Sequence, residues 1–341
     1  MAADAGVLVN RRARLALAAA ALAAMAVSGC AGQPPADGGG GGADVPVSAA
    51  EPAPLGVTTV PAEPPEPPTQ AAACDPTASL RPTGPLPPSG QMPPGSTMER
   101  ILQRGRLIVG VDQSSYLFGF RDPFTGAIQG FDIDVIRQVA QAIFGDPNRV
   151  QYVVVSSADR VPVLQRGDVD LVASTLTITC DRARAVDFST VYYDAGQRIL
   201  VRRDSGFRGL DDLHGRPVCA AKGSTSIHHV AQAASHPVVV GVDDWGDCLV
   251  MLQQGQVDAI STDDAVLAGM VAQDPYTVVV GPRFTDEPYG VGVPKGAEDM
   301  VRFVNAVLDR MRADGGWQAS YQHWLGAALG PAQPPPARYR D

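Results

Sequence analysis

Short apolar runs and segments with helical periodicity alternate along the chain from about residue 100 to residue 330. Arg106–Asp112 (RLIVGVD) is a continuous apolar run followed by turn residues, which predicts a strand buried on both faces. In Gly130–Gly145 (GFDIDVIRQVAQAIFG) the apolar residues recur at helical spacing and the segment ends at glycine, which predicts a helix. Strands that alternate with helices in this way predict an α/β fold with a largely parallel sheet.

The second half of this region repeats the rhythm of the first half. Val163–Thr175 (VLQRGDVDLVAST) and Met251–Asp263 (MLQQGQVDAISTD) each contain a helix end, a glycine turn, a Val-Asp pair and a strand with a polar end. Glycine commonly ends a helix before a strand, so part of this likeness needs no further explanation. The shared polar ends predict two similar α/β lobes with a cleft between them, because ligands bind at the carboxyl ends of strands in such sheets.

The N-terminus is typical of an exported chain. Basic residues, among them Arg11 and Arg14, precede an apolar run over 15–27 that is short for a membrane span. Small residues then lead to Cys30, so residues 1–29 are predicted to be a signal peptide. A cysteine at this place resembles the bacterial lipobox, which implies a lipid on Cys30 and attachment to the extracytoplasmic face of the cell membrane. The alternative is an ordinary signal peptide with an incidental thiol.

The composition changes after the signal peptide. Residues 30–97 are rich in Pro, Gly and Ala and poor in large apolar side chains. Such a segment cannot bury enough surface to offset its ordering entropy, so we expect a disordered tether. The formal net charge of the whole chain is −9, which argues against a nucleic-acid partner. Beyond the N-terminal run, no segment is long and apolar enough to span a bilayer.

Four of the five cysteines remain once Cys30 is assigned to the lipid. An even number in an exported chain predicts two disulfides, and four cysteines allow three pairings. Cys219 and Cys248 lie in one sequence region, which favours a bond between them. Cys74 closes the tether and Cys180 follows the first polar strand end, so the second favoured pair is 74–180.

Five segments in colinear order carry a resemblance to a known family: GFDIDV, LQRGDVDLVASTLTITCDRARAVDFSTVY, AAKGSTS, VDAISTDDAVLAG and DGGWQASYQHWLG. Together they span about residues 100–325 and resemble the amino-acid-binding proteins of bacterial ABC importers, solute-binding family 3. Within that family, the actinobacterial lipoproteins of glutamine/glutamate-binding type look most similar. The resemblance implies an α/β periplasmic-binding-protein type II fold, a monomer of two α/β lobes joined by a two-strand hinge.

The same resemblance sets the expected domain boundaries. Lobe 1 is expected over residues 98–197 plus 292–330, and lobe 2 over 198–291. The hinge strands are expected near 197–201 and 289–293. The last residues, 331–341, are expected to form a flexible tail.

The resemblance also implies that the site holds the two charged groups of a free amino acid. Arg182 matches the guanidinium that clamps the α-carboxylate, and Asp263 matches the carboxylate that pairs with the ammonium group. Asp264 is the alternative, because the match permits a shift of one residue, and either Asp also suits a helix N-cap. The alternative for Arg182 is a surface ion pair with Asp181 or Asp187. Further contacts to the ligand are expected from Thr175, Thr177, Thr225 and Ser226.

Selectivity is expected at the end of the ligand's side chain. Ser157 and Arg160 match the S-x-x-R of family members that take glutamate or aspartate, because a second guanidinium favours a second carboxylate. The alternative for Arg160 is a surface ion pair with Asp159 or Asp168. The expected ligands are glutamate and aspartate, with asparagine and glutamine weaker and basic amino acids rejected. Less specific matches add four side chains near this end: Tyr116, Phe118, Lys222 and Trp245.

Two other classes of function remain as alternatives. The first is an enzyme on the same fold, such as a dehydratase, but it would need an acid or base in the cleft, and none of the five histidines is among the residues expected to contact the ligand. The second is a sensor with the same lobes, which would signal to a membrane partner instead of an ABC permease. A zinc site is disfavoured, because the chain has no CxxC spacing and the adjacent His228 and His229 are not spaced as ligands. We therefore predict a binding protein with no metal or cofactor.

Overall fold

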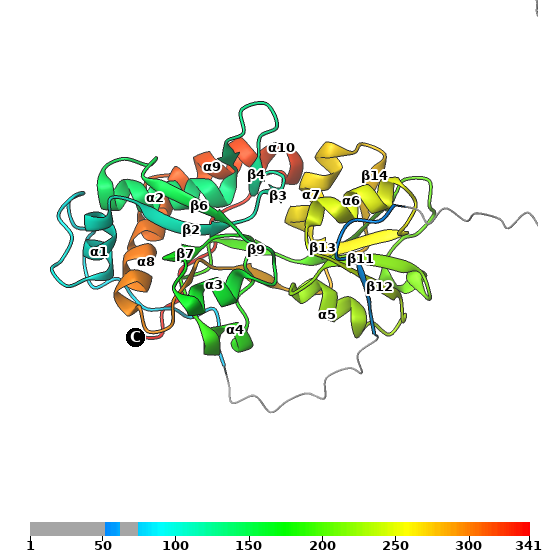
Figure 1. Cartoon of the computed structure of the whole chain (residues 1–341), viewed down its shortest axis with the longest axis horizontal. Helices are drawn as coiled ribbons and strands as arrows, with labels where there is room; N and C mark the ends of the chain where they lie inside the picture. Colours follow the sequence, from blue (N-terminus) through cyan, green and yellow to red (C-terminus); the bar gives the residue numbers. More distant parts are fainter. Residues whose placement is uncertain (1–51, 62–73) are drawn as a thin grey trace, which may run out of the picture. The chain divides into compact units, whose positions relative to one another are not determined.

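The computed structural model describes residues 52–61 and 74–341, and its two main sheets define two lobes, which we call lobe 1 and lobe 2 (Figure 1). Lobe 1 is built on a five-stranded sheet in the order β6-β2-β7-β16-β8. The strands β6, β2 and β7 run parallel, as the sequence pattern predicts, and β16 runs antiparallel to β7 and β8. The bounds are β2 (Leu107–Val111), β6 (Val150–Val154), β7 (Leu171–Val172), β8 (Asp187–Phe188) and β16 (Gly292–Val293).

Helices cover the sheet of lobe 1. The helix α2 (Phe131–Phe144) confirms the helical spacing of its apolar residues, which are buried, and it ends at Gly145 with φ 73°. A small three-stranded sheet precedes it, formed by β3 (Ser114–Ser115), β4 (Gly119–Arg121) and β5 (Ile128–Gln129). The other helices are α1 (Thr97–Arg104), α3 (Arg160–Arg166), α4 (Cys180–Ala185), α8 (Glu298–Ala313), α9 (Gly316–Trp324) and α10 (Gly326–Leu329).

Lobe 2 is built on a six-stranded sheet in the order β1-β12-β11-β13-β10-β14. The strand β11 runs parallel to β12 and β13, whereas β10 runs antiparallel to β13 and β14. The strands are β1 (Thr58–Val60), β10 (Gln197–Arg202), β11 (Pro217–Ala221), β12 (Val238–Val242), β13 (Ala259–Asp263) and β14 (Thr277–Val280). The helices are the 3₁₀ turn η1 (Leu210–Leu213), α5 (Thr225–Ala231), α6 (Trp245–Gln253) and α7 (Asp264–Gln273).

Two antiparallel strands lie where the chain crosses between the lobes. They are β9 (Tyr193–Ala195) and β15 (Glu287–Tyr289), and Tyr289 pairs with Tyr193. The sequence prediction placed the crossings slightly later, near 197–201 and 289–293. At the first crossing, the apolar run that follows Gln197 pairs with β13 and β14 inside the sheet of lobe 2. At the second, Gly292 and Val293 form β16 in the sheet of lobe 1. These positions therefore belong to a sheet and not to the connection.

Two terminal segments differ from the prediction of a disordered tether and a flexible tail. The strand β1, inside the predicted tether, adds to the edge of lobe 2 antiparallel to β12 (Figure 1). Ser79, also in the predicted tether, pairs with Tyr339 of the predicted tail. The last residue, Asp341, forms an ion pair of 2.6 Å with Arg302 on α8. Composition did not reveal these contacts, because each segment is ordered by its partners on the lobes and not by a core of its own.

Both favoured disulfides are present. Cys74–Cys180 joins the segment before α1 to the first residue of α4, and Cys219–Cys248 joins β11 to α6 within lobe 2. The predicted signal peptide, the predicted lipid site at Cys30 and half of the predicted tether lie outside the described residues. Among the residues that are described, no helix is long and apolar enough to cross a membrane.

Candidate functional site

A small pocket lies between the two lobes, where the polar strand ends meet. Thr175 follows β7 on lobe 1, and Asp263 ends β13 on lobe 2. The two recurring phrases of the sequence therefore place their polar ends on opposite walls of one pocket, as their pattern predicted. The side chains that line it are Arg160, Thr175 and Thr177 from lobe 1 and Ser224, Thr225, Ser226, Trp245, Thr262, Asp263 and Val266 from lobe 2.

Arg160 is buried in the wall of lobe 1 at the start of α3. Its Nε donates to the carbonyl of Ser157 at 3.0 Å, and its Nη1 donates to the carbonyls of Ser174 and Thr175 at 2.9 and 3.0 Å. Ser157 thus contributes its backbone oxygen to the site, and it does not line the pocket. The alternative of a surface ion pair fails, because Arg160 is only 4% exposed and its hydrogen bonds go to backbone carbonyls.

Two nearby carboxyl groups compensate the charge of Arg160. Burial lowers the pKa of Arg160, and the nearby charge of Asp112 opposes that shift. Asp112 accepts hydrogen bonds from the hydroxyls of Ser114 and Ser115 at 2.9 and 2.7 Å. Burial raises the pKa of Asp132 to about 6, although that carboxylate also accepts a hydrogen bond from a tyrosine hydroxyl. The wall of lobe 1 therefore has one buried cation near a buried carboxyl group, Asp132, and a half-buried one, Asp112.

Thr175 has a strained backbone at the edge of the pocket. Its φ is 41°, in the left-handed region that a β-branched residue rarely adopts. Its N–H donates to Asp132 Oδ2 at 2.8 Å, and its carbonyl accepts from Arg160. These two contacts hold the strained conformation in place. Strain of this kind is concentrated at binding sites, which supports a functional role for the pocket.

Arg182, in α4 of lobe 1, connects the two lobes at the rim of the pocket. Its Nη1 donates to the carbonyl of Thr177 at 2.8 Å, and its Nη2 donates across the boundary to the carbonyl of Gly223 at 3.1 Å. Burial, followed by the charge of Arg160, lowers the pKa of Arg182 to about 9. The alternative of a surface ion pair fails here too, because Asp181 pairs with Arg184 and Asp187 pairs with Lys295.

Asp263 is the carboxylate that faces the pocket from lobe 2. The hydroxyl of Tyr289 donates to its Oδ2 at 2.6 Å. Its Oδ1 is buried and has no hydrogen-bond partner within the described part of the chain. Burial, followed by the charge of Glu287, raises the pKa of Asp263 to about 8. The pocket can therefore accommodate a donor group on a bound molecule at Asp263 Oδ1.

Asp264 lies outside the pocket. It accepts a hydrogen bond from the N–H of Gly196 at 3.3 Å and forms an ion pair with Arg283. The side chain of Asp263 makes no capping hydrogen bond to α7, so the N-cap alternative does not account for its burial. Of the two candidate carboxylates, Asp263 is the one that the fold turns toward the pocket.

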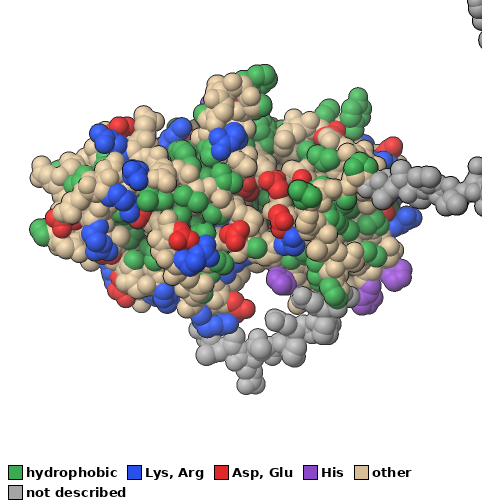
Figure 2. Space-filling view, in the orientation of Figure 1, with side chains coloured by type: hydrophobic (Ala, Val, Ile, Leu, Met, Phe, Trp, Pro, Cys, Tyr) green, Lys and Arg blue, Asp and Glu red, His purple; other side chains and the backbone are tan. Residues whose placement is uncertain are grey.

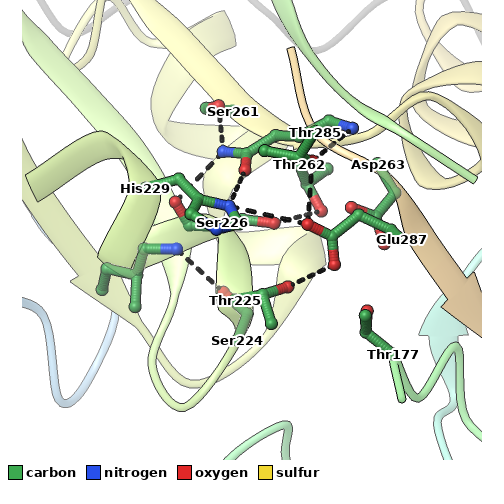
Figure 3. A network of polar contacts seen from close by, with 12 residues as sticks. Thr177, Ser224, Thr225, Ser226, His229, Ser261, Thr262, Asp263, Thr285 and Glu287 are labelled. Atoms are coloured by element: carbon green, nitrogen blue, oxygen red, sulfur yellow. Dashed lines mark hydrogen bonds and ion pairs between the residues drawn. The ribbon is translucent and has the colours of Figure 1, made fainter. Parts of the chain in front are cut away.

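The turn from β11 into α5 forms the opposite edge of the pocket. Ser224 caps the helix, with its Oγ accepting from the N–H of Ile227 at 3.2 Å. The hydroxyl of Thr225 donates to Glu287 Oε2 at 2.7 Å (Figure 3). The hydroxyl of Ser226 donates to Thr262 at 3.4 Å. The Thr225 proton is therefore used within the protein, which leaves the backbone N–H groups of this turn as the donors for an anion.

Glu287 is a part of the site that the sequence did not reveal. It is 1% exposed, lies on β15, and accepts hydrogen bonds from Thr225 and Thr285 at 2.7 and 2.8 Å. The Nδ1 atom of His229 lies 3.5 Å from Glu287 Oε1, so this histidine contacts the site through Glu287 (Figure 3). None of the sequence motifs includes Glu287. Its one sequence signal is an acidic residue two positions before Tyr289, in a crossing strand.

Three predicted contacts lie away from the pocket. Phe118 is fully buried and packs edge-on against other aromatic rings of lobe 1, including Phe131 at 5.8 Å between ring centroids. Tyr116 packs on Phe120. Lys222 forms an ion pair of 2.7 Å with Asp243 and donates to the carbonyl of Gly56 near β1. Packing or surface pairing explains the position of each of the three, whereas Trp245 does line the pocket.

Comparison with known proteins places these features in a family. Residues 107–327 match the model of the bacterial extracellular solute-binding proteins, family 3. The chain is 38% identical over 230 residues to an ABC transporter glutamine-binding protein of Bacillus subtilis, covering 67% of this chain and 84% of that protein. It is 32% identical to a glutamate-binding protein of Corynebacterium glutamicum, over 66% of this chain and 80% of that protein.

Solved structures agree with this assignment. An ancestral arginine-binding protein bound to glutamine has a TM-score of 0.61 and 36% identity, covering 65% of this chain and 99% of that one. A solute receptor for L-cysteine from Neisseria gonorrhoeae has a TM-score of 0.66 and 26% identity, covering 69% and 96%. The fold is therefore the two-lobed periplasmic-binding-protein type II fold.

Proposed function

Because the chain belongs to the bacterial extracellular solute-binding proteins of family 3, we propose that it captures a free α-amino acid between its lobes for an ABC importer. One observation carries the proposal: Asp263 has a buried oxygen without a partner, and the guanidinium of Arg182 lies at the rim of the same pocket. The ammonium group of an amino acid would supply the missing donor. Its α-carboxylate would meet Arg182 and the free N–H groups at the start of α5.

The proposed ligands are glutamate and aspartate, with glutamine and asparagine binding less tightly. Arg160 supports this order, because it lines the pocket and its Nη2 makes no hydrogen bond to the described residues. A second carboxylate on the ligand would accept from that free nitrogen. Basic amino acids would bring a third cation beside Arg160 and Arg182 and would be rejected.

A specific observation favours a second candidate, in which the amides bind more tightly than the acids. Asp112 and Asp132 already compensate Arg160, so a second carboxylate would enter a wall without excess positive charge. Trp245 also lines an adjoining depression that contains Asp243 and Asp244. Figure 2 shows acidic side chains gathered over the boundary of the two lobes. Such a field disfavours an anionic ligand.

Calorimetry with the twenty amino acids separates the two candidates. The variant Arg160→Ala removes the guanidinium, and Arg166→Ala in the same helix, whose arginine pairs with Asp168 on the surface, is the matched control. The first candidate predicts that glutamate binds wild type tightest and that Arg160→Ala weakens glutamate much more than glutamine. The second predicts that glutamine binds tightest and that both weaken equally. Failure of wild type to bind any amino acid would refute the proposed function.

We further propose that the protein acts as a monomer on the extracytoplasmic face, held to the membrane by a lipid on Cys30. The residues that support this proposal are the basic segment, the apolar run and the cysteine of the N-terminus. Mass spectrometry of the membrane fraction should find a diacylated Cys30 as the first residue, and Cys30→Ser should release the protein from the membrane.

A signal to a membrane sensor is the alternative to delivery of the amino acid to an ABC permease. Loss of amino-acid uptake in a deletion strain would favour delivery.

A further inference from the structure

Two glycines of lobe 2 face backbone atoms of lobe 1 on either side of the pocket. A Cβ atom added at Gly269 in α7 would lie 2.3 Å from the carbonyl oxygen of Tyr116. A Cβ atom added at Gly223 would lie 2.4 Å from the Cα of Ala158. Real Cβ atoms essentially never come within 3.0 Å of such atoms. The lobes can therefore approach this closely only because both positions have no side chain.

Gly269 has no local reason to be glycine. Gly223 has φ 73°, in the left-handed region, so its turn requires glycine whatever lies opposite. Gly269 instead lies inside α7 and does not have a positive φ. Glycine in a helix interior is less stable than alanine by about 0.5–1 kcal/mol. The contact with Tyr116 is the feature of the structure that accounts for it.

The carbonyl of Tyr116 is held in place and cannot move away easily. The residue after it, Leu117, has φ 78°, and its own carbonyl accepts from the N–H of Phe131 at 2.9 Å. The N–H of Phe118 donates to the carbonyl of Ser115 at 3.0 Å, and the Phe118 ring is fully buried. A methyl group on α7 would therefore push the lobes apart and would not displace the loop.

We propose that Gly269 is a positioning residue that sets how closely lobe 2 approaches lobe 1 around the ligand. The helix α7 begins at Asp264, directly after Asp263, so a shift of α7 carries the pocket carboxylate with it. Relieving the contact requires the distance to grow from 2.3 Å to at least 3.0 Å. Binding geometries tolerate only about 0.5 Å of such displacement. The inference rests on the proposed function, because it concerns closure around an amino acid.

The variant Gly269→Ala tests this proposal, with Gly246→Ala as the matched control. Gly246 lies in α6 at the same boundary, but a Cβ atom there would be 3.9 Å from Ser114 of lobe 1 and would otherwise meet only Asp244 Oδ1 of its own lobe, at 3.1 Å. Calorimetry should show at least tenfold weaker binding of the best amino acid to Gly269→Ala and less than threefold change for the control. The melting temperature of unliganded Gly269→Ala should be equal to wild type or higher, because alanine favours the helix.

Small-angle X-ray scattering gives an independent measure of closure. Addition of the amino acid should make wild type and Gly246→Ala more compact. In the presence of the amino acid, Gly269→Ala should be less compact than either of them. Binding of Gly269→Ala within twofold of wild type, with equal compaction, would overturn the proposal. If Gly269→Ala does not fold, a crystal structure of the wild-type protein with its amino acid tests the proposal instead. The proposal would be overturned if a Cβ atom built at Gly269 lay more than 3.4 Å from every atom of lobe 1.

The proposal and the proposed function can fail separately. If wild type binds an amino acid and Gly269→Ala binds it equally well, the role of Gly269 is refuted and the binding function stands. If wild type binds none of the twenty amino acids, the binding function is refuted. Scattering of the unliganded proteins then tests the contact alone, and a Gly269→Ala chain as compact as wild type would overturn it.

Discussion

The two walls of the pocket bring opposite charges, and they differ in how completely those charges are paired. Arg160 and Arg182 on lobe 1 donate hydrogen bonds to backbone carbonyls of the protein itself. Asp263 on lobe 2 has one oxygen bound by Tyr289 and one buried oxygen with no partner in the described part of the chain. The protein itself therefore satisfies most of the cationic wall, apart from Arg160 Nη2, which has no acceptor among the described residues. On the anionic wall, a buried acceptor has no partner.

This asymmetry indicates where binding free energy comes from. A buried acceptor without a donor costs roughly 1–3 kcal/mol, and a ligand ammonium group would remove that cost. The guanidinium groups gain less when a ligand binds, because they already donate hydrogen bonds to the protein. Those hydrogen bonds hold the two arginine side chains in place, which lowers the entropic cost of ordering them on binding. In the proposed function, lobe 1 would orient the ligand and lobe 2 would gain most from its binding, and each prediction below tests one of these two roles.

The largest loss of binding is expected for Arg182→Ala. The substitution removes the proposed partner of the α-carboxylate and also the hydrogen bond to Gly223 across the lobe boundary. Leaving a buried charge unpaired costs roughly 2–5 kcal/mol, so the affinity for every amino acid should fall at least about 30-fold. Arg184→Ala, which removes only an exposed ion pair with Asp181, is the control. A loss below tenfold in calorimetry would show that Arg182 does not hold the ligand.

Asp263→Asn should lose binding to a similar extent but change stability in the opposite direction. At pH 8.5 the wild-type carboxylate is largely ionised in a buried site, because its pKa is raised to about 8. The amide removes that buried charge, so the melting temperature of the unliganded protein should rise, whereas Arg182→Ala should lower it. Asp264→Asn, outside the pocket, is the control for binding. A lower melting temperature for Asp263→Asn would contradict the unpaired role of this carboxylate.

Binding should weaken as the pH falls from 8 to 6. Burial and the charge of Glu287 raise the pKa of Asp263 to about 8, so the empty pocket is increasingly protonated below that pH. An ammonium group pairs with the ionised form and lowers this pKa, so a proton is released on binding. The dissociation constant should rise by up to about tenfold per pH unit. Calorimetry in buffers of different ionisation enthalpy measures how many protons are released on binding. A dissociation constant that does not change between pH 6 and 8 would contradict the assignment of Asp263 as the partner of the ammonium group.

The same linkage predicts how the stability of the unliganded protein changes with pH. A carboxyl group whose folded-state pKa is raised above its value of 3.8 in a free chain stabilises the folded state when it is protonated. The contribution of Asp263 is therefore present at low pH and is lost as the pH rises from about 4 to about 8. Thermal unfolding of wild type and Asp263→Asn should differ most at the upper end of this range, and an equal difference at pH 5 and pH 8.5 would argue against it.

The smallest effect is expected for Thr225→Val. The Thr225 hydroxyl donates to Glu287 and is not available as a donor for the α-carboxylate, so in the proposed complex only its backbone N–H would meet the ligand. Losing one hydrogen bond of this kind costs roughly 0.5–1.5 kcal/mol, which corresponds to about 2- to 13-fold in affinity. Thr225→Ser should bind like wild type. A loss as large as that of Arg182→Ala would show that the hydroxyl itself holds the ligand.

Sequence patterns predicted the fold and the two walls of the pocket because each of these features depends on a pattern within a single segment of the chain. The alternation of strands and helices predicted the α/β lobes, and the repeated phrase ending at Thr175 and Asp263 predicted the pocket. Glu287 and Gly269 were missed, since a buried carboxylate beside a crossing strand and a helical glycine at a lobe boundary have no local signature. The strand β1 was missed for the same reason: its order depends on the edge of β12.

A crystal structure of the wild-type protein with glutamate or glutamine bound tests the central claim most directly. The account predicts the ligand ammonium within hydrogen-bond distance of Asp263 Oδ1, the α-carboxylate against Arg182 and the N–H groups of Thr225 and Ser226, and the side chain directed toward Arg160. A ligand that lies outside this pocket, or that leaves Asp263 Oδ1 without a partner, would contradict it.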